Sequence, residues 1–214
     1  MKDIVIIGAG GCAREVQFLI ERINKTVPTY HLLGFVDEQL AVGSIVNGIP
    51  VIGGNDFLIH YPKQLAVAIS IGSGHIREIL YQKFKINPNL TFPNLIDPSV
   101  IDSNRITLGI GNIICAGCIL TVNIQISDFV VLNLDCTISH DCILDSFVTV
   151  SPGTNVAGNV HIHSLSYLGI SSTVIQGKII GRNTTIGAGA VVVDDIPANC
   201  TAVGVPAKPI KFLS

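Results

Sequence analysis

The sequence contains no tryptophan, one methionine and few other aromatic residues, with 4 tyrosines and 8 phenylalanines among 214 residues. Its apolar content therefore comes mainly from isoleucine, valine, leucine and alanine, which favours β-rich packing. Charge is also scarce, because 13 lysines and arginines, spread along the chain, stand against 15 aspartates and glutamates. We expect neither nucleic acid nor a membrane surface as a partner, since both select clustered positive charge. A small molecule is the expected partner.

Long apolar runs are missing as well. Glycine, aspartate, asparagine or histidine interrupts each apolar run before it reaches the ~18 residues that a membrane span requires. The N-terminal apolar stretch is preceded by Asp3 and followed by Arg14-Glu15, which is unlike a signal peptide. We therefore expect a cytoplasmic chain in which the 6 cysteines are reduced residues rather than a disulfide framework.

A repeat of six residues extends from Leu108 to Val192. Every sixth residue of this stretch is aliphatic, and the position four residues after each is usually small or β-branched, with Asn112 and Lys178 as departures. One large and one small inward residue per hexad is typical of hexapeptide β-helix repeats, in which three hexads complete one turn. An ordinary sheet would show a period of two and a helix a period of 3.6. We predict a parallel β-helix over residues 96–214.

The first 95 residues follow another pattern. DIVIIGAGG (3–11) indicates a buried strand that enters a glycine turn, CAREVQFLIERIN (12–24) a helix, and YHLLGFVDE (30–38) a second strand. QLAVAISIGS (64–73) and HIREILYQKFK (75–85) indicate a further strand and helix. We predict a small doubly wound, Rossmann-like α/β domain over residues 1–95, with three prolines in NPNLTFPNLIDPSV (87–100) at its boundary.

Two features of this domain suggest a nucleotide. The turn Gly8-Ala9-Gly10-Gly11 lies between a strand and a helix, where backbone N–H groups can bind a phosphate, although a turn without a ligand is the alternative. Asp37 and Glu38 end the second strand, where an acidic residue can reach a ribose hydroxyl. Gly72-Ser73-Gly74 ends a later strand at the same expected edge. With only about four strands, a mononucleotide fits better than a whole NAD.

The segment Ile138-Ser139-His140-Asp141-Cys142-Ile143 places a histidine and a carboxylate within the repeats. The hexad register puts both residues at a corner of the coil. Gly158 follows His140 by one turn, so a ligand has room to approach the imidazole and an N–H is available to an oxyanion. His140 is therefore a candidate general base, with Asp141 holding one tautomer. A solvated pair at a corner is the alternative.

Two pairs have the spacing of metal ligands, Cys115-x-x-Cys118 and His161-x-His163. The register directs Cys118 inward, with Cys136 stacked over it, and no second CxxC exists. Because Ile162 points inward, both histidines face outward or lie at a corner, and surface exposure is the simpler interpretation. We expect no metal.

The chain resembles a known family through the segments IVIIGAGGCARE, LLGFVDE, GIPVIGG, FPNLIDPSV, NLDCTISHDCILDSFVTVSPGTNVAGNV and GAGAVVVDDIPANCTAVGVPAK. It is similar, over essentially its whole length, to the bacterial sugar acyltransferases that include sialic acid O-acetyltransferases and UDP-4-amino-sugar (bacillosamine-type) N-acetyltransferases. The hexads and GVPAK occur in many hexapeptide acyltransferases. The glycine-rich N-terminal domain joined to SHDC is specific to this subgroup.

The resemblance implies a homotrimer of left-handed β-helices that binds acetyl-CoA between neighbouring subunits and a nucleotide sugar on the N-terminal domain. It gives His140 the role of catalytic base, Asp141 that of the acid beside it, often Glu in relatives, and Asn133 a place in the site. The implied contacts are Thr149, Ile170 and Ala188 with CoA, and Gly10, Gly11, Cys12, Asp37, Glu38 and Gly72 with the nucleotide sugar. Thr149 replaces a histidine of bacillosamine-type enzymes, and Ala188 replaces a glycine.

Together, the patterns and the resemblance predict acetyl transfer to the amine of a nucleotide-linked amino sugar, in surface glycan or glycoprotein sugar biosynthesis. The unbroken hexad register provides no extruded loop, so the N-terminal domain is expected to supply the acceptor site. Lys208, in VPAK, is a candidate for a CoA phosphate, with a solvated tail lysine as the alternative. A sugar O-acetyltransferase and a non-catalytic nucleotide-sugar-binding trimer stay open as alternatives.

Overall fold

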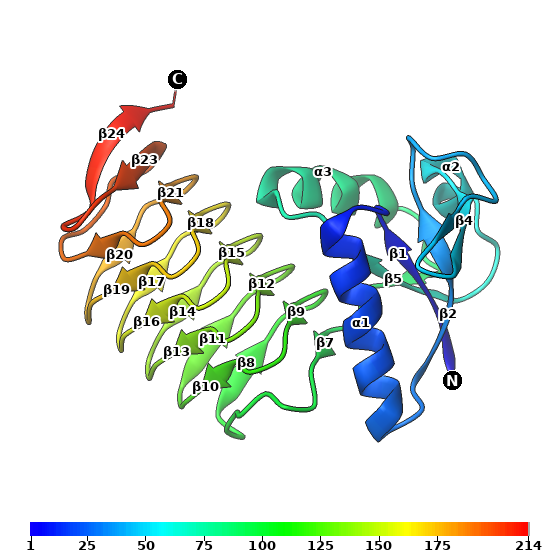
Figure 1. Cartoon of the computed structure of the whole chain (residues 1–214), viewed down its shortest axis with the longest axis horizontal. Helices are drawn as coiled ribbons and strands as arrows, with labels where there is room; N and C mark the ends of the chain where they lie inside the picture. Colours follow the sequence, from blue (N-terminus) through cyan, green and yellow to red (C-terminus); the bar gives the residue numbers. More distant parts are fainter. Residues whose placement is uncertain (214) are drawn as a thin grey trace. The chain divides into compact units, whose positions relative to one another are not determined.

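The computed structural model describes residues 1–213, which form two compact units (Figure 1). The first unit is Met1–Pro98, and the second begins at Ser99. No helix within residues 1–213 is long and apolar enough to cross a membrane.

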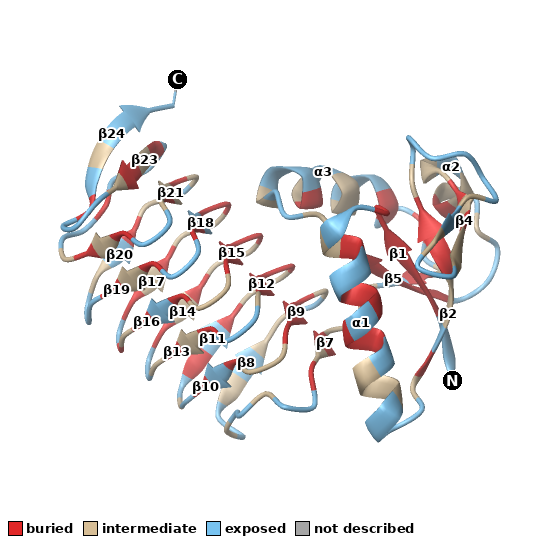
Figure 2. Cartoon of the chain, viewed as in Figure 1, coloured by how far each residue is buried: buried red, intermediate tan, exposed pale blue. Residues whose placement is uncertain are grey.

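The first unit is built on a sheet whose strands lie in the order β3-β4-β2-β1-β5-β6. Its pairs are parallel except for the β3–β4 hairpin. The bounds are β1 (Lys2–Ile7), β2 (Tyr30–Val36), β3 (Ile45–Val46), β4 (Ile49–Gly53), β5 (Leu65–Ile69) and β6 (Leu90–Thr91), and the unit also contains the short β7 (Leu95–Ile96). The central strand β5 is wholly buried and β1 is buried from Ile4 to Ile7, as Figure 2 shows, because helices cover them.

Three helices connect these strands: α1 (Gly11–Thr26), α2 (Asn55–Ile59) and α3 (Gly74–Phe84). The α1 helix buries Val16, Leu19 and Ile20 at helical spacing, which packs one of its faces on the sheet. The alternation of strand and helix confirms the doubly wound α/β architecture predicted for this part of the chain.

The second unit is the predicted left-handed parallel β-helix, and it has three faces. The β10 face is β10-β13-β16-β19-β22, the β8 face is β8-β11-β14-β17-β20, and the β9 face is β9-β12-β15-β18-β21 followed by β23 and β24. The bounds are β8 (Ile106–Leu108), β9 (Ile113–Ile114), β10 (Ile119–Leu120), β11 (Ile124–Ile126), β12 (Val131–Leu132), β13 (Thr137–Ile138), β14 (Ile143–Leu144), β15 (Thr149–Val150), β16 (Asn155–Val156), β17 (His161–Ile162), β18 (Tyr167–Leu168), β19 (Thr173–Val174), β20 (Ile179–Ile180), β21 (Thr185–Ile186), β22 (Val191–Val192), β23 (Cys200–Val203) and β24 (Lys208–Phe212).

The register of this unit follows the hexads. Leu120 pairs with Ile138, which pairs in turn with Val156, so eighteen residues complete one turn. The aliphatic positions from Ile114 to Val192 are all buried, and Leu108 is partly exposed. Cys118 and Cys136 are both fully buried on adjacent coils, as predicted.

The corners of the coil repeat one backbone feature. One residue in every hexad, from Gly111 to Gly189, has a positive φ. Asp141 is among them, with φ of 60°. Aspartate and asparagine adopt this left-handed region more readily than most residues, because their short side chains can bond locally. The left-handed backbone at position 141 is therefore one that aspartate adopts readily.

Candidate active site

His140 and Asp141 form a hydrogen-bonded pair at the corner between β13 and β14. His140 Nδ1 lies 2.9 Å from Asp141 Oδ2, so the shorter carboxylate reaches the ring. Asn123 Nδ2, one coil below, donates to Asp141 Oδ1 over 3.0 Å. The hydrogen bonds from His140 and then from Asn123 hold the pKa of the Asp141 carboxyl below its ordinary value.

The hydrogen bond between His140 and Asp141 is the one expected of a general base and a carboxylate that orients it. An ionised carboxylate only accepts hydrogen bonds, so Nδ1 of a neutral His140 carries the proton and Nε2 is the basic nitrogen. The side chains of His140 and Asp141 are 48% and 52% exposed, which leaves the ring accessible to a substrate.

Gly158 lies directly against the imidazole. A Cβ built on Gly158 would collide with Cε1 and Nε2 of His140 and would lie 2.9 Å from its Cδ2. The space left by the missing side chain is therefore used by the imidazole itself, rather than by a ligand beside it. The backbone N–H of the next residue, Asn159, donates to the His140 carbonyl over 2.8 Å, which joins the two coils at this point.

The other residues expected in the β-helix site lie elsewhere on the coil. Asn133 follows β12, Ile170 follows β18 and Ala188 follows β21, so these three share the corner after the β9 face. Thr149 lies in β15 of the β9 face and is 6% exposed. His140, by contrast, lies at the corner after the β10 face. A single chain thus does not bring this group to the imidazole.

Two of the expected contacts already have partners. Asn133 Oδ1 accepts from the N–H of Leu134 over 2.8 Å. Lys208, on β24, donates to Asp194 Oδ2 over 2.8 Å, and both side chains are 62% exposed. An exposed pair of this kind is weak, so it does not prevent Lys208 from meeting a phosphate.

In the first unit, a cleft of about 340 Å³ opens at the carboxyl ends of β1 and β2 and at the start of α1. It is lined by Gly10, Asp37 and Glu38 among the expected residues, together with Asn55 and Ile71. Ligands of parallel α/β sheets usually bind at these carboxyl ends of the strands. Helix α1 begins here with Gly10 as its N-cap and no side-chain cap, so its first N–H groups face the cleft region without a capping oxygen.

The two acidic residues of the cleft also shape the backbone around it. Asp37 Oδ1 accepts from the N–H groups of Gln39 and Leu40 over 2.8 and 3.1 Å. Glu38 Oε1 accepts from the N–H of Asn55, at the start of α2. Each carboxylate uses one oxygen in these contacts and has a second oxygen that can accept from a hydroxyl.

The remaining expected residues of the first unit lie around this cleft rather than in it. Gly11 lines a neighbouring shallow depression with Arg14 and Asn47. Cys12 is partly buried, and burial, followed by the nearby Glu15, raises the pKa of its thiol. The Gly72 carbonyl accepts from Arg77 Nη1 over 3.0 Å.

Arg77 was not singled out from the sequence. It is 1% exposed, and its Nη1 also donates to the Ile71 carbonyl over 2.8 Å. Burial lowers the pKa of Arg77 to about 10. The guanidinium thus fixes the loop between β5 and α3 that borders the cleft. No pattern distinguishes it beforehand, since arginine within a helix is usually exposed.

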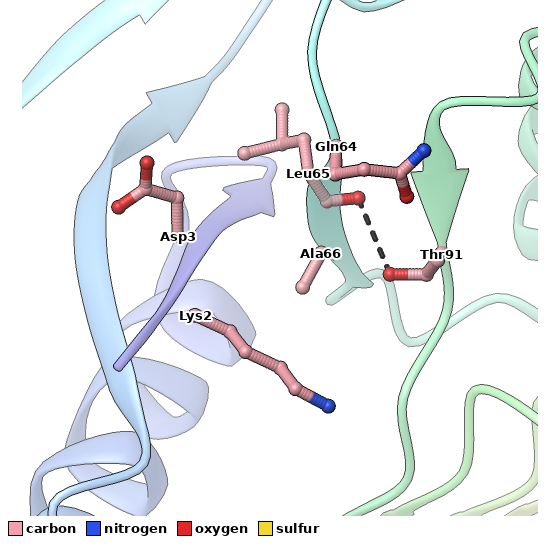
Figure 3. A pocket seen from close by; sticks show the side chains of 6 residues that line it. All are labelled: Lys2, Asp3, Gln64, Leu65, Ala66 and Thr91. Carbon is pink, nitrogen blue, oxygen red and sulfur yellow. Dashed lines mark hydrogen bonds between the residues drawn. The ribbon is translucent and has the colours of Figure 1, made fainter.

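A second hollow of about 290 Å³ lies at the other ends of the strands, the amino ends (Figure 3). It is lined by Lys2, Asp3, Gln64, Leu65, Ala66 and Thr91, and Thr91 Oγ1 donates to the Leu65 carbonyl over 3.4 Å. Lys2, Asp3, Gln64, Leu65 and Ala66 stand at the amino ends of β1 and β5, and Thr91 lies in β6. Because ligands of such sheets bind at the carboxyl ends, this hollow is not our candidate for the nucleotide.

Comparisons with known proteins cover both units. A family described as the PglD N-terminal domain matches residues 3–84. The chain is 30% identical over 213 residues to GDP-perosamine N-acetyltransferase of Escherichia coli O157:H7, with 96% of this chain and 95% of that protein covered.

Two solved structures are also similar to this chain over nearly its whole length. The acetyltransferase domain of PglB from Neisseria gonorrhoeae FA1090, in complex with acetyl coenzyme A, has a TM-score of 0.88 and 32% identity over 98% of this chain and 99% of its own. A histidine-to-asparagine mutant of perosamine N-acetyltransferase from Caulobacter crescentus, in complex with CoA and GDP-perosamine, has a TM-score of 0.89 and 30% identity over 99% and 98%.

Proposed function

Because the chain belongs to the hexapeptide-repeat family of bacterial sugar acyltransferases, we propose that it transfers the acetyl group of acetyl-CoA to the amine of a nucleotide-linked amino sugar. The observation that carries the proposal is the His140–Asp141 pair, with Nδ1 held by the carboxylate, Nε2 left as the basic nitrogen and the side chain 48% exposed. Both the E. coli and the Caulobacter relatives carry N-acetyltransferase in their names.

The reaction proceeds by direct attack. The sugar amine attacks the thioester carbonyl, and His140 Nε2 removes a proton from the nitrogen as the C–N bond forms. An N–H of the corner near Gly158 stabilises the tetrahedral oxyanion. The C–S bond then breaks, the sulfur takes up the proton that His140 removed, and CoA leaves as a thiol. No covalent enzyme intermediate is required.

Asp141 acts through His140. Its carboxylate keeps the proton on Nδ1 and stabilises the imidazolium that forms during transfer. Asn123 holds Asp141 in turn, which limits the rotation of the carboxylate. We assign His140 as the catalytic base and Asp141 and Asn123 as positioning residues.

We further propose that acetyl-CoA binds between two copies of the chain. The His140 corner and the corner with Ile170 and Ala188 flank the β10 face on its two sides. A homotrimer packed through its β10 faces brings the His140 corner of one copy beside the Ile170 corner of the next. This arrangement joins residues that one chain keeps apart.

The nucleotide is assigned to the cleft in the first unit. The uncapped start of α1 at Gly10 suits a phosphate, and Asp37 and Glu38 suit the ribose hydroxyls. We therefore expect an acceptor with a nucleoside diphosphate carrier rather than a free sugar.

The assay is thiol release from acetyl-CoA with a panel of UDP-, dTDP- and GDP-linked amino sugars, with the product mass confirmed. We expect thiol release with at least one amino sugar, and His140→Ala should lower turnover by about 10²–10⁴-fold while acetyl-CoA still binds. Acetylation of hydroxy sugars alone would show an O-acetyltransferase. Nucleotide binding without thiol release would show a binding protein.

A mixing experiment tests the shared site. We expect His140→Ala and Ala188→Trp each to be inactive. Randomly reassembled mixed trimers should then recover about a quarter of the wild-type rate, because one site in four receives an intact residue from each side. No recovery in mixed trimers would place the whole site within one chain.

A further inference from the structure

The β8 face carries a cluster of three side chains that acetyl transfer does not use. His163 Nδ1 lies 2.9 Å from Asp145 Oδ2, and His161 Nε2 lies 3.0 Å from Asp145 Oδ1. The three candidate donor atoms all lie within 4.8 Å of one another. The sequence indicated surface exposure for the two histidines, and the structure adds a carboxylate that binds both.

The stacking of the coils brings these residues together. Strands β14 and β17 are paired with Leu144 opposite Ile162, so the next residues, Asp145 and His163, occupy equivalent places on adjacent coils (Figure 1). His161 points to the same side as His163 because Ile162 between them is fully buried. Neighbouring strands lie ~4.8 Å apart. The donor atoms therefore converge without any loop movement.

The cluster is also accessible to a cation from solvent. The two imidazole rings lie 4.0 Å apart between centroids. The three side chains are 32–37% exposed, so an ion can enter from solvent.

We propose that Asp145, His161 and His163 form a binding site for a divalent transition-metal ion, best matched by Zn²⁺. Two imidazole nitrogens and one carboxylate oxygen are a ligand set that Zn²⁺ takes with its fourth position open. Bonds of ~2.0–2.2 Å place the donors of a tetrahedral ion about 3.4 Å apart, within the spread of this cluster. On binding, each coordinating nitrogen gives its proton to the other ring nitrogen or to solvent, and a water completes the coordination.

The ion joins two coils that matter for the proposed active site. His140 precedes β14 and Gly158 precedes β17, so the segments that carry the imidazole and its glycine at one end carry the cluster at the other. Metal binding therefore resists separation of these coils and raises the unfolding temperature. It takes no part in the acetyl transfer.

The experiment uses tag-free protein freed of metal with a chelator. Zn²⁺ affinity is measured in competition with a chromophoric chelator, and Co²⁺ coordination by visible absorption. We expect one ion per chain and the intense Co²⁺ bands of four- or five-coordination. Asp145→Asn, His161→Asn and His163→Asn should each weaken Zn²⁺ binding by more than about 100-fold, since loss of an outer-shell partner alone costs 10–100-fold.

His31→Asn is the matched control. His31 Nδ1 lies 2.9 Å from Asp3 Oδ1, a His–Asp pair of the same chemistry without a second histidine. Its loss should leave Zn²⁺ affinity at the wild-type value. Equal affinity in the wild type and His163→Asn would overturn the proposal. So would a Co²⁺ spectrum of the hydrated six-coordinate ion in the wild-type chain, a result that needs no variant to fold. Neither readout depends on acetyltransferase activity.

Discussion

Gly158→Ala is the substitution that examines the site most directly. A Cβ at this position collides with Cε1 and Nε2 of His140 and lies 2.9 Å from Cδ2. Non-bonded carbon atoms prefer separations of about 3.5–4.0 Å, so the ring has to retreat by about 1 Å or more. The φ of Gly158 lies outside the left-handed region, so alanine itself introduces no backbone strain.

The sizes of the changes in stability and in kcat depend on where the His140 ring can move. The His140 side chain is 48% exposed, so the imidazole can swing toward solvent instead of distorting the coil. The free energy of unfolding should therefore change by less than about 1 kcal/mol. A displacement of about 1 Å of a catalytic group costs on the order of 100-fold in rate, or about 2.7 kcal/mol in activation free energy. We expect kcat to fall by that factor.

The assay is the kcat for thiol release, measured in wild type, Gly158→Ala, His140→Ala and the double variant. If the new Cβ acts only through the ring, it should add no loss once His140 is alanine. A wild-type kcat in Gly158→Ala would refute the reasoning. Equal losses in both backgrounds would show that the Cβ obstructs the substrate instead of the imidazole.

Three further predictions follow from single contacts. Asp141→Asn should lower kcat by at least about tenfold, but by less than the ~10⁴-fold known for a buried acid, because Asp141 is half exposed; an unchanged kcat would remove its positioning role. Since the pKa of Asp141 is lowered, its pairing contributes stability above about pH 4 and loses it as the pH falls through the lowered pKa. Urea unfolding of wild type and Asp141→Asn should then differ at pH 7 and converge in strong acid. Arg22→Ala removes the bidentate partner of Asp97, whose side chain is 1% exposed, and should lower the midpoint of urea denaturation; a midpoint equal to that of the wild type would contradict a structural role for this pair.

Much of the fold could be predicted because the signals are local and repeated. An aliphatic residue at every sixth position from Leu108 to Val192 is typical of a coil with three faces, and the repeated positions support one common register. The glycine turn after the first strand likewise indicates a strand entering a helix. Because eighteen residues complete one turn, the sequence also places Gly158 one coil above His140.

The sequence alone determined the faces of the coil, the corner that carries His140 and the glycine stacked on it, because these depend on backbone register. Only the tertiary structure decided which polar side chains contact one another. It directs Asp141 onto Nδ1, with Asn123 behind it, and it turns two histidines of one coil toward Asp145 of another. Such contacts depend on rotamers and on the αL corners, which a period of six does not specify.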